Sequence, residues 1–214
     1  MCFALPFITF INIKSRLMRM PTLQLCAYVW LALGGAVSVA FPLFLLRYNT
    51  TMYNRTKVSP LRLPTWGMDV LGICLWISFW GTVSLPWSKQ EEIPLYMLLL
   101  RWTLFLPSLV PATPVKNHED HSMPFPLYCA LAVLITGYHW YQSLKVIMGE
   151  SLDFNLHHSQ AAICDFALCF FSLVLYIFHY KRLGFTASLT FILLVPFLSL
   201  GSTFSLLVIF EVYH

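Results

Sequence analysis

The chain has 214 residues, of which 58% are hydrophobic and 10% are charged, and its formal net charge is +4. Soluble domains carry about 25% charged residues, so this composition indicates a polytopic membrane protein and excludes a separate soluble catalytic domain. The positive charges form no long run, which argues against a nucleic-acid partner. The lipid bilayer is therefore the expected surrounding of the chain.

The N-terminal stretch is apolar and is followed by Lys14, Arg16 and Arg19. A signal peptide has its positive charges before the apolar stretch, so this order predicts a retained segment, residues 1–22, that lies along the membrane interface. The six cysteines lie in apolar stretches without the spacing of a zinc site or a disulfide framework. They are interpreted as small packing residues.

Six later stretches are apolar over enough residues to cross about 30 Å of hydrocarbon as helices. They cover residues 23–46, 66–87, 93–112, 125–148, 161–180 and 185–210. The prediction is an all-α integral membrane protein, one polytopic domain over 1–214 with three-helix halves at 23–114 and 124–211. Overlaid at an offset of 96 residues, the halves match in pattern as an inverted repeat would. Any six-span chain gives a similar overlay, so both readings stay open.

Membrane orientation is not decided by the charges. If each stretch crosses once, five lysines and arginines lie on one side and seven on the other, which gives no clear positive side. Asn49-Thr50-Thr51 and Asn54-Arg55-Thr56 match the glycosylation pattern, but both lie close to the end of the first stretch. They are interpreted as chance matches.

Two carboxyl groups, Asp69 and Asp165, lie well inside long apolar stretches. They are 96 residues apart, and each comes seven residues after a basic or titratable residue, Arg62 or His158. An ionised carboxylate in hydrocarbon costs several kcal/mol, so such residues usually face a protein interior or cavity. Seven residues correspond to about 10 Å of helix, so both could border one central cavity. A shielded carboxyl favours its neutral form and can act as a general acid; the alternative is a structural, hydrogen-bonded carboxyl.

Arg101 lies within the third stretch, where it needs a carboxylate or carbonyl partner. Pairing with Asp69 would keep that carboxylate ionised and leave Asp165 as the better acid. Alternatively, Arg101 extends to the interface. His139 is a candidate proton relay, or an interfacial histidine of the aromatic belt.

Aromatic residues make up 16% of the chain. Ring faces can stabilise a carbocation, and the candidates for this role are Trp76, Trp80, Trp102 and Tyr176. Lipid contact and packing would explain most of them equally well. The polar stretch 118–121 contains two histidines and two acids, but it lacks a second ligand set at helical spacing, so no metal site is expected.

Residues 59–76, 98–107 and 158–165, followed by Ser172, resemble the small membrane-embedded terpene cyclases of fungal meroterpenoid pathways. The resemblance covers about a third of the chain, and Tyr176 stands where that pattern has Trp. It implies a prenylated substrate, an epoxidised farnesyl chain on an aromatic or other polar core, protonated by an intramembrane acid and cyclised through carbocations. No metal or other cofactor is implied, which agrees with the missing aspartate-rich motif.

The expected function is therefore a protonation-initiated terpene cyclase, an isomerase of the endoplasmic reticulum membrane, with Asp165 or Asp69 as the acid. One alternative is a small proton-coupled transporter with inverted repeats, in which Pro107, Pro196 and Gly201 break helices near the binding site. The other is a membrane subunit without a site of its own.

Overall fold

The computed structural model describes residues 4–34, 37–53, 61–84, 91–114, 125–148, 156–179 and 184–213. Within these ranges the regular secondary structure is helical except for one pair of two-residue strands. The helices are α1 Ala4–Leu17, α2 Thr22–Leu33, α3 Val37–Tyr53, α4 Thr65–Ser84, α5 Ile93–Phe105, η2 Leu106–Leu109, α6 Phe125–Ile147, α7 Leu156–His179, α8 Phe185–Leu198 and α9 Leu200–Tyr213, and the strands are β1 Leu61–Arg62 and β2 Thr113–Pro114. The predicted all-α class is confirmed.

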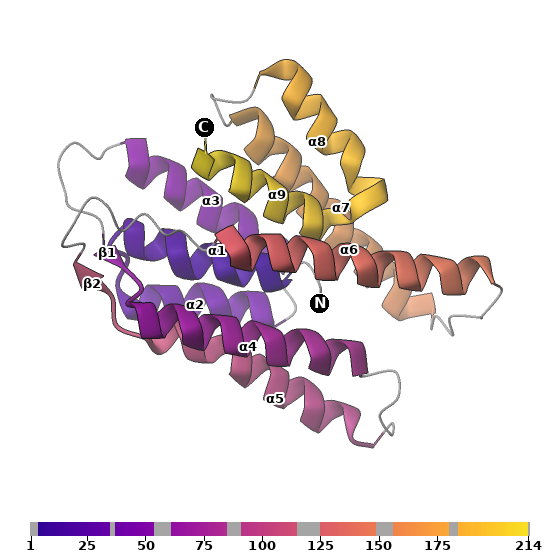
Figure 1. Ribbon diagram of the computed structural model, residues 1–214, viewed down its shortest axis with the longest axis horizontal. Coiled ribbons are helices and arrows are strands. Elements are labelled where there is room, and N and C mark those ends of the chain that lie inside the picture. The colour runs from indigo at the N-terminus through magenta and orange to yellow at the C-terminus, as the bar shows by residue number, and fades with distance from the viewer. Residues whose placement is uncertain are drawn as a thin grey trace.

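Helix α1 runs through the middle of the molecule (Figure 1). It contacts α2, α3, α4, α6 and α9, and nearly all of its side chains are buried, including Phe7 and Phe10 at 0% exposure. This position differs from the interfacial one expected for residues 1–22. The physical reason is that residues 4–13 are almost entirely apolar and therefore pack well against five neighbouring helices.

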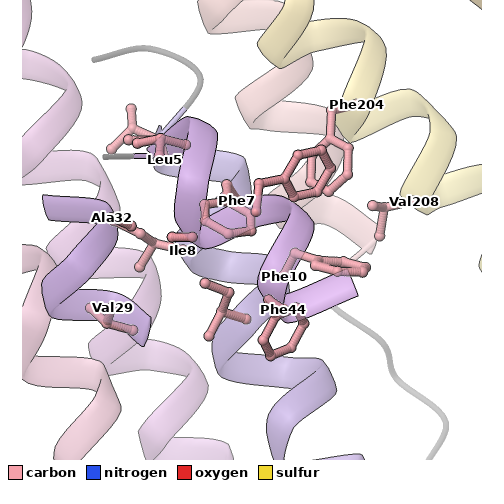
Figure 2. Packing of buried hydrophobic residues seen from close by; sticks show 14 of the residues in the cluster. Leu5, Phe7, Ile8, Phe10, Val29, Ala32, Phe44, Phe204 and Val208 are labelled. Atoms are coloured by element: carbon pink, nitrogen blue, oxygen red, sulfur yellow. The ribbon is translucent and has the colours of Figure 1, made fainter. Parts of the chain in front are cut away.

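The two opposite faces of α1 have different chemistry. Phe7, Phe10 and Lys14 recur at intervals of three and four residues and lie toward α3 and α9, as Figure 2 shows for the two rings. Thr9, Asn12 and Arg16 recur at the same intervals, half a turn around the helix. All three are buried as well. An aromatic stripe and a polar stripe are thus both inside the bundle.

The first predicted span, 23–46, is two helices instead of one. Helix α2 ends at Leu33, α3 begins at Val37, and the two pack against each other. The C-cap of α2 is Gly34, which lies in the Gly34-Gly35 pair of the sequence. Glycine disfavours a continuous helix by about 1 kcal/mol per residue, so this pair is a weak point at which the chain can reverse direction.

The last predicted span, 185–210, is also two helices. Helix α8 ends at Leu198, α9 begins at Leu200, and Ser199 between them has φ 78°. Pro196 cannot donate a helical hydrogen bond, and the Ser199 hydroxyl accepts one from the Ser202 amide at 3.4 Å, which caps α9. The two helices pack against each other, so residues 185–210 form a pair of short helices and not one long segment.

The remaining predicted spans correspond to single elements. Helix α4 matches 66–87, α5 with η2 covers 93–109, and α6 and α7 match 125–148 and 161–180. Among the described residues, α4 is the one helix both long and apolar enough to cross a membrane. Strands β1 and β2 pair antiparallel, Leu61 with Pro114, and join the start of α4 to the end of α5.

The helix breaks do not repeat between the two halves. At the offset of 96 residues, Gly34 aligns with Ala130 inside α6, and Ser199 aligns with Thr103 inside α5. Both α6 and α5 are continuous at those positions. The overlay of the halves therefore rests on the order of apolar segments and not on their internal geometry.

Candidate functional site

Asp69 lies on the outer face of α4. Its side chain is exposed, and it shares a helical stripe with Trp66, Ile73 and Trp76, which are 54%, 59% and 54% exposed. The buried face of α4 carries other residues, including Leu71 and Ser78. This finding differs from the expectation that Asp69 borders a central cavity.

Arg101 lies on α5 next to α4 but makes no salt bridge with Asp69. Both residues are within the described chain, and no oxygen of Asp69 comes within 4.0 Å of the guanidinium. The Arg101 Nε atom is buried without a hydrogen-bond partner, while the side chain as a whole is half-buried. The predicted charge pair is therefore not formed.

His139 joins α6 to the end of α8. Its Nε2 lies 3.3 Å from the carbonyl oxygen of Pro196; because a carbonyl only accepts, this contact assigns the proton to Nε2. Two further hydrogen bonds join the same elements. Thr136 of α6 donates to the Leu198 carbonyl at 3.4 Å, and Ser202 of α9 donates to the Ala132 carbonyl of α6 at 3.1 Å. His139 is thus part of a polar attachment between α6 and the α8–α9 break.

Three of the four predicted cation-stabilising aromatics face outward. Trp76, Trp80 and Trp102 are 54%, 49% and 49% exposed. Trp76 packs edge-on against Trp80 at a centroid distance of 5.7 Å, and Trp102 packs against Trp30 of α2 at 5.6 Å. These rings cover the outside of α2, α4 and α5 and do not surround a common interior point.

The fourth, Tyr176, belongs to a buried group of rings that we call the central aromatic cluster. It is formed by side chains of α1, α3, α7 and α9: Phe7, Phe10, Phe41, Phe44, Tyr48, Tyr176 and Phe204. Phe10 is at its centre, with centroid distances of 6.0 Å to Tyr176 and 5.2 Å to Phe204. Figure 2 shows Phe10 beside Phe44. Sequence reasoning missed this cluster, although Phe7 and Phe10 already had helical spacing.

The central aromatic cluster already holds a positive charge. The Lys14 ammonium nitrogen lies 5.8 Å from the centroid of Phe10 and 5.6 Å from that of Tyr48. Cations within about 6 Å of a ring centroid are attracted by the negative ring face. The rings are therefore arranged so that a cation over the faces of Phe10 and Tyr48 is stabilised.

Asp165 lies in the N-terminal half of α7, and its side chain is outside the described part of the structure. Its position precedes Cys169, Ser172 and Tyr176 by four, seven and eleven residues. These intervals assign the four positions to one face of a helix. The last three are buried, at 2%, 7% and 4% exposure.

A second cation is buried on the polar stripe of α1. Arg16 is 4% exposed and donates from Nη2 to the carbonyl oxygen of Pro107 at 2.9 Å, which ties α1 to η2. Its Nε and the Oδ1 of Asn12 have no hydrogen-bond partner. Burial lowers the pKa of Arg16 to about 10, so the guanidinium is still charged at neutral pH.

The other predicted features add no site. The polar stretch 118–121 lies outside the described residues. In the part of the chain that is described, His, Cys, Asp and Glu nowhere form a group of three that could hold a metal. Cys26, Cys74 and Cys129 are free thiols, and Cys26 lies 3.5 Å from the Ser108 hydroxyl.

No family model, no curated protein and no solved structure matches this chain.

Proposed function

We propose that this chain is a multi-pass terpene cyclase of the endoplasmic reticulum membrane that isomerises a prenylated epoxide. The proposal combines the resemblance of residues 59–76, 98–107 and 158–165 to membrane-embedded cyclases with one observation about α7. That helix carries an acidic residue, Asp165, and, on the same face, Tyr176 of the central aromatic cluster. An acid and a buried group of rings are the two parts that such a reaction needs.

In the proposed reaction, the Asp165 carboxyl transfers its proton to the epoxide oxygen. The C–O bond to the more substituted carbon breaks, and the chain's own double bonds attack the cation to close the rings. A proton is then lost from the last carbon, so one proton enters and one leaves, and the product is an isomer of the substrate. The general acid requires a neutral carboxyl, which apolar surroundings favour.

The central aromatic cluster is the proposed environment of the carbocation. Its rings come from four helices and exclude water, since Phe10 and Phe204 have 0% exposure. The ring faces can stabilise a cation there, and the exclusion of water removes the commonest nucleophile that would capture it. Along α7, Asp165 and Tyr176 are separated by about 16 Å at 1.5 Å per residue. An extended farnesyl chain is of comparable length, so the face of α7 between them is the proposed substrate path.

The membrane placement is supported by the outer surface. Helix α4 is the candidate membrane-crossing helix of the described chain. Exposed large apolar side chains also occur on α2, α5, α7 and α8: Trp30, Leu98, Leu99, Phe171, Leu175, Leu189 and Leu193. Contiguous apolar surface of this extent is typical of a lipid-facing or partner-covered exterior.

The test is product formation in microsomes from a host without other cyclases, fed with an epoxyfarnesyl-phenol. We expect cyclised product from the wild type, its loss in Asp165→Asn, and partial recovery in Asp165→Glu, which keeps a carboxyl. Asp69→Asn is the matched control and should retain product, because Asp69 lies on the outer face of α4. Intact substrate with wild-type protein, over a panel of such epoxides, would remove the cyclase proposal.

A transporter is the second candidate, and the break between α8 and α9 is the observation that favours it. Broken helices near the membrane midplane are the usual binding sites of transporters built on inverted repeats. At the α8–α9 break, the carbonyls of Pro196 and Leu198 accept hydrogen bonds from side chains of α6. Proton-dependent uptake of solute into reconstituted vesicles, combined with no cyclised product, would favour this function over the cyclase.

A further inference from the structure

The α2–α3 hairpin changes which charged residues share an end of the molecule. Contacts between α1 and α3 pair Phe7 with Phe41, Phe10 with Phe44 and Lys14 with Tyr48. The partner is 34 residues later in every case, so α1 and α3 run parallel and in register. A single continuous span over 23–46 would instead have placed the ends of these two segments on opposite sides of the membrane.

The end at which α1 and α3 finish is basic. Strands β1 and β2 lie there, beside the start of α4 and the end of α5 (Figure 1). The cations on the described stretches at this end are Lys14, Arg16, Arg19, Arg47, Arg62 of β1 and Arg101 near the end of α5, and Asp69 is the acid near the start of α4. Arg19 and Arg47 are exposed, while Lys14 and Arg16 are buried behind them.

The opposite end has the reverse balance among the described residues. Glu91 and Glu92 are exposed at the turn before α5. Lys145 lies near the end of α6 at the same side of the molecule, with its ammonium 5.2 Å from the Tyr141 ring centroid. Among the described residues, cations therefore outnumber acids at the β1–β2 end, and acids outnumber cations at the other end.

We propose that the β1–β2 end faces the cytoplasm and lies against the anionic phospholipid headgroups of that leaflet. Lysine and arginine accumulate on the cytoplasmic side of membrane proteins, and the cytoplasmic leaflet carries a negative surface potential that attracts them. The inference rests on the multi-pass membrane placement of the proposed function, but it does not depend on cyclase activity.

The orientation also determines whether the first glycosylation sequence can be modified. Asn49-Thr50-Thr51 lies in the last turns of α3, at the basic end. The Thr50 hydroxyl donates to the carbonyls of Leu46 and Arg47, both at 3.0 Å, so this sequence is part of the helix. Glycosylation occurs on the lumenal side, and we expect Asn49 to remain unmodified.

The experiment labels single introduced cysteines in sealed microsomes with a membrane-impermeant maleimide. Thr22→Cys lies at the first residue of α2, at the basic end, and Ser84→Cys at the last residue of α4, at the other end. Both side chains are exposed and neither substitution changes a charge. The wild-type chain, with its own cysteines, sets the background.

We expect Thr22→Cys to be labelled before detergent is added and Ser84→Cys only afterwards, with no endoglycosidase-sensitive shift of the wild type. The reverse labelling order would overturn the orientation. Labelling of both positions before detergent would overturn the membrane placement itself. Expected labelling together with a failed cyclase assay would remove the proposed activity and leave this inference standing.

A second variant tests whether the cations set the orientation. Arg19 has φ 53° at the turn after α1, a conformation that asparagine tolerates, so Arg19→Asn is combined with Arg47→Gln in the Thr22→Cys background. Loss of part of the labelling before detergent is expected. Unchanged labelling would show that these two charges do not determine which end faces the cytoplasm.

Discussion

Helices α1 and α4 show opposite relations between sequence and burial. Helix α1 contains Lys14, Arg16 and Asn12, yet all three side chains are buried. Helix α4 is the long apolar helix of the described chain, yet 33% of its most apolar stretch is buried. The difference teaches that apolar residues of this protein are divided between its core and its outer surface, while a partly polar helix forms its centre.

The centre tolerates polar residues because α1 satisfies several of them itself. The Thr9 hydroxyl donates to the Leu5 carbonyl at 2.8 Å, and the Asn12 amide donates to the Ile8 carbonyl at 3.0 Å. Such bonds to the preceding turn offset much of the cost of burying a polar side chain. The unpartnered atoms that remain, Nε of Arg16 and Oδ1 of Asn12, are where this compensation is incomplete.

The largest difference between α1 and α4 should be in how much the free energy of unfolding falls when an aromatic side chain is removed. Phe10→Ala removes a fully buried ring with neighbours on α3, α7 and α9 and should lower the free energy of unfolding by about 3–5 kcal/mol. Trp76→Ala on α4 removes a ring that is 54% exposed and should cost about 1 kcal/mol or less. Denaturant titration in detergent micelles measures both; equal losses would contradict the central position of α1.

The buried charge of α1 should produce a pH dependence. Burial lowers the pKa of Arg16 from its ordinary value to about 10 in the folded chain, so the folded state holds this proton less tightly than the unfolded state does. Below pH 10 the buried charge therefore opposes folding, by roughly 3 kcal/mol. That cost diminishes as the pH rises from 10 toward 12.5.

Arg16→Met keeps an unbranched side chain and removes the charge. We expect this variant to be more stable than the wild type at pH 8, and the difference to narrow above pH 10. Comparing the two proteins at each pH cancels the titration of tyrosines and lysines. A difference that does not change between pH 8 and 11 would show that the charge of Arg16 carries no such cost.

Replacing a glycine of α4 by alanine should destabilise the protein only where α5 packs closely against that glycine. A Cβ atom at Gly81 would overlap the Leu100 side chain, while one at Gly72 would meet no atom within 4 Å. We expect Gly81→Ala to destabilise the protein by about 1–3 kcal/mol and Gly72→Ala to be neutral or stabilising by up to about 1 kcal/mol. Thermal unfolding of both variants is the measurement, and similar shifts in Tm would argue against close packing at Gly81.

The smallest effect is expected at Asp69. Its side chain is exposed on the outer stripe of α4, so Asp69→Leu should change the free energy of unfolding by about 0.5 kcal/mol or less. The same denaturant titration measures it. A large loss would mean that the carboxyl has a partner in the native protein, and it would restore Asp69 as a candidate for the proposed site.

The extent of the helices was largely predictable, because long apolar stretches without strand periodicity favour helix over strand. The ranges 66–87 and 125–148 correspond closely to α4 and α6. Pro196 and Gly201 indicated a break near Ser199, but the reversals of the chain direction at Gly34 and Ser199 were not predicted. A stretch of about 24 apolar residues has the same composition whether it forms one helix or two, and only packing against neighbours decides between them.

The candidate site was predicted in part. Sequence reasoning identified Asp165 and Tyr176, which helical spacing assigns to one face of α7. It also selected Trp76, Trp80 and Trp102, which lie on the outer surface. Aromatic content alone cannot distinguish a ring that faces lipid from one in the interior, since both environments are apolar.

By itself, the sequence determined the helical class, the apolar exterior and the position of the acidic residues along the chain, because these follow from local composition and spacing. Only the tertiary structure decided that α1 is central, that Asp69 faces outward while Tyr176 joins the central aromatic cluster, and that α1 and α3 end on the same side. These outcomes depend on contacts between residues far apart in sequence, such as Phe10 with Phe204. Local periodicity carries no information about which helix such a face will meet.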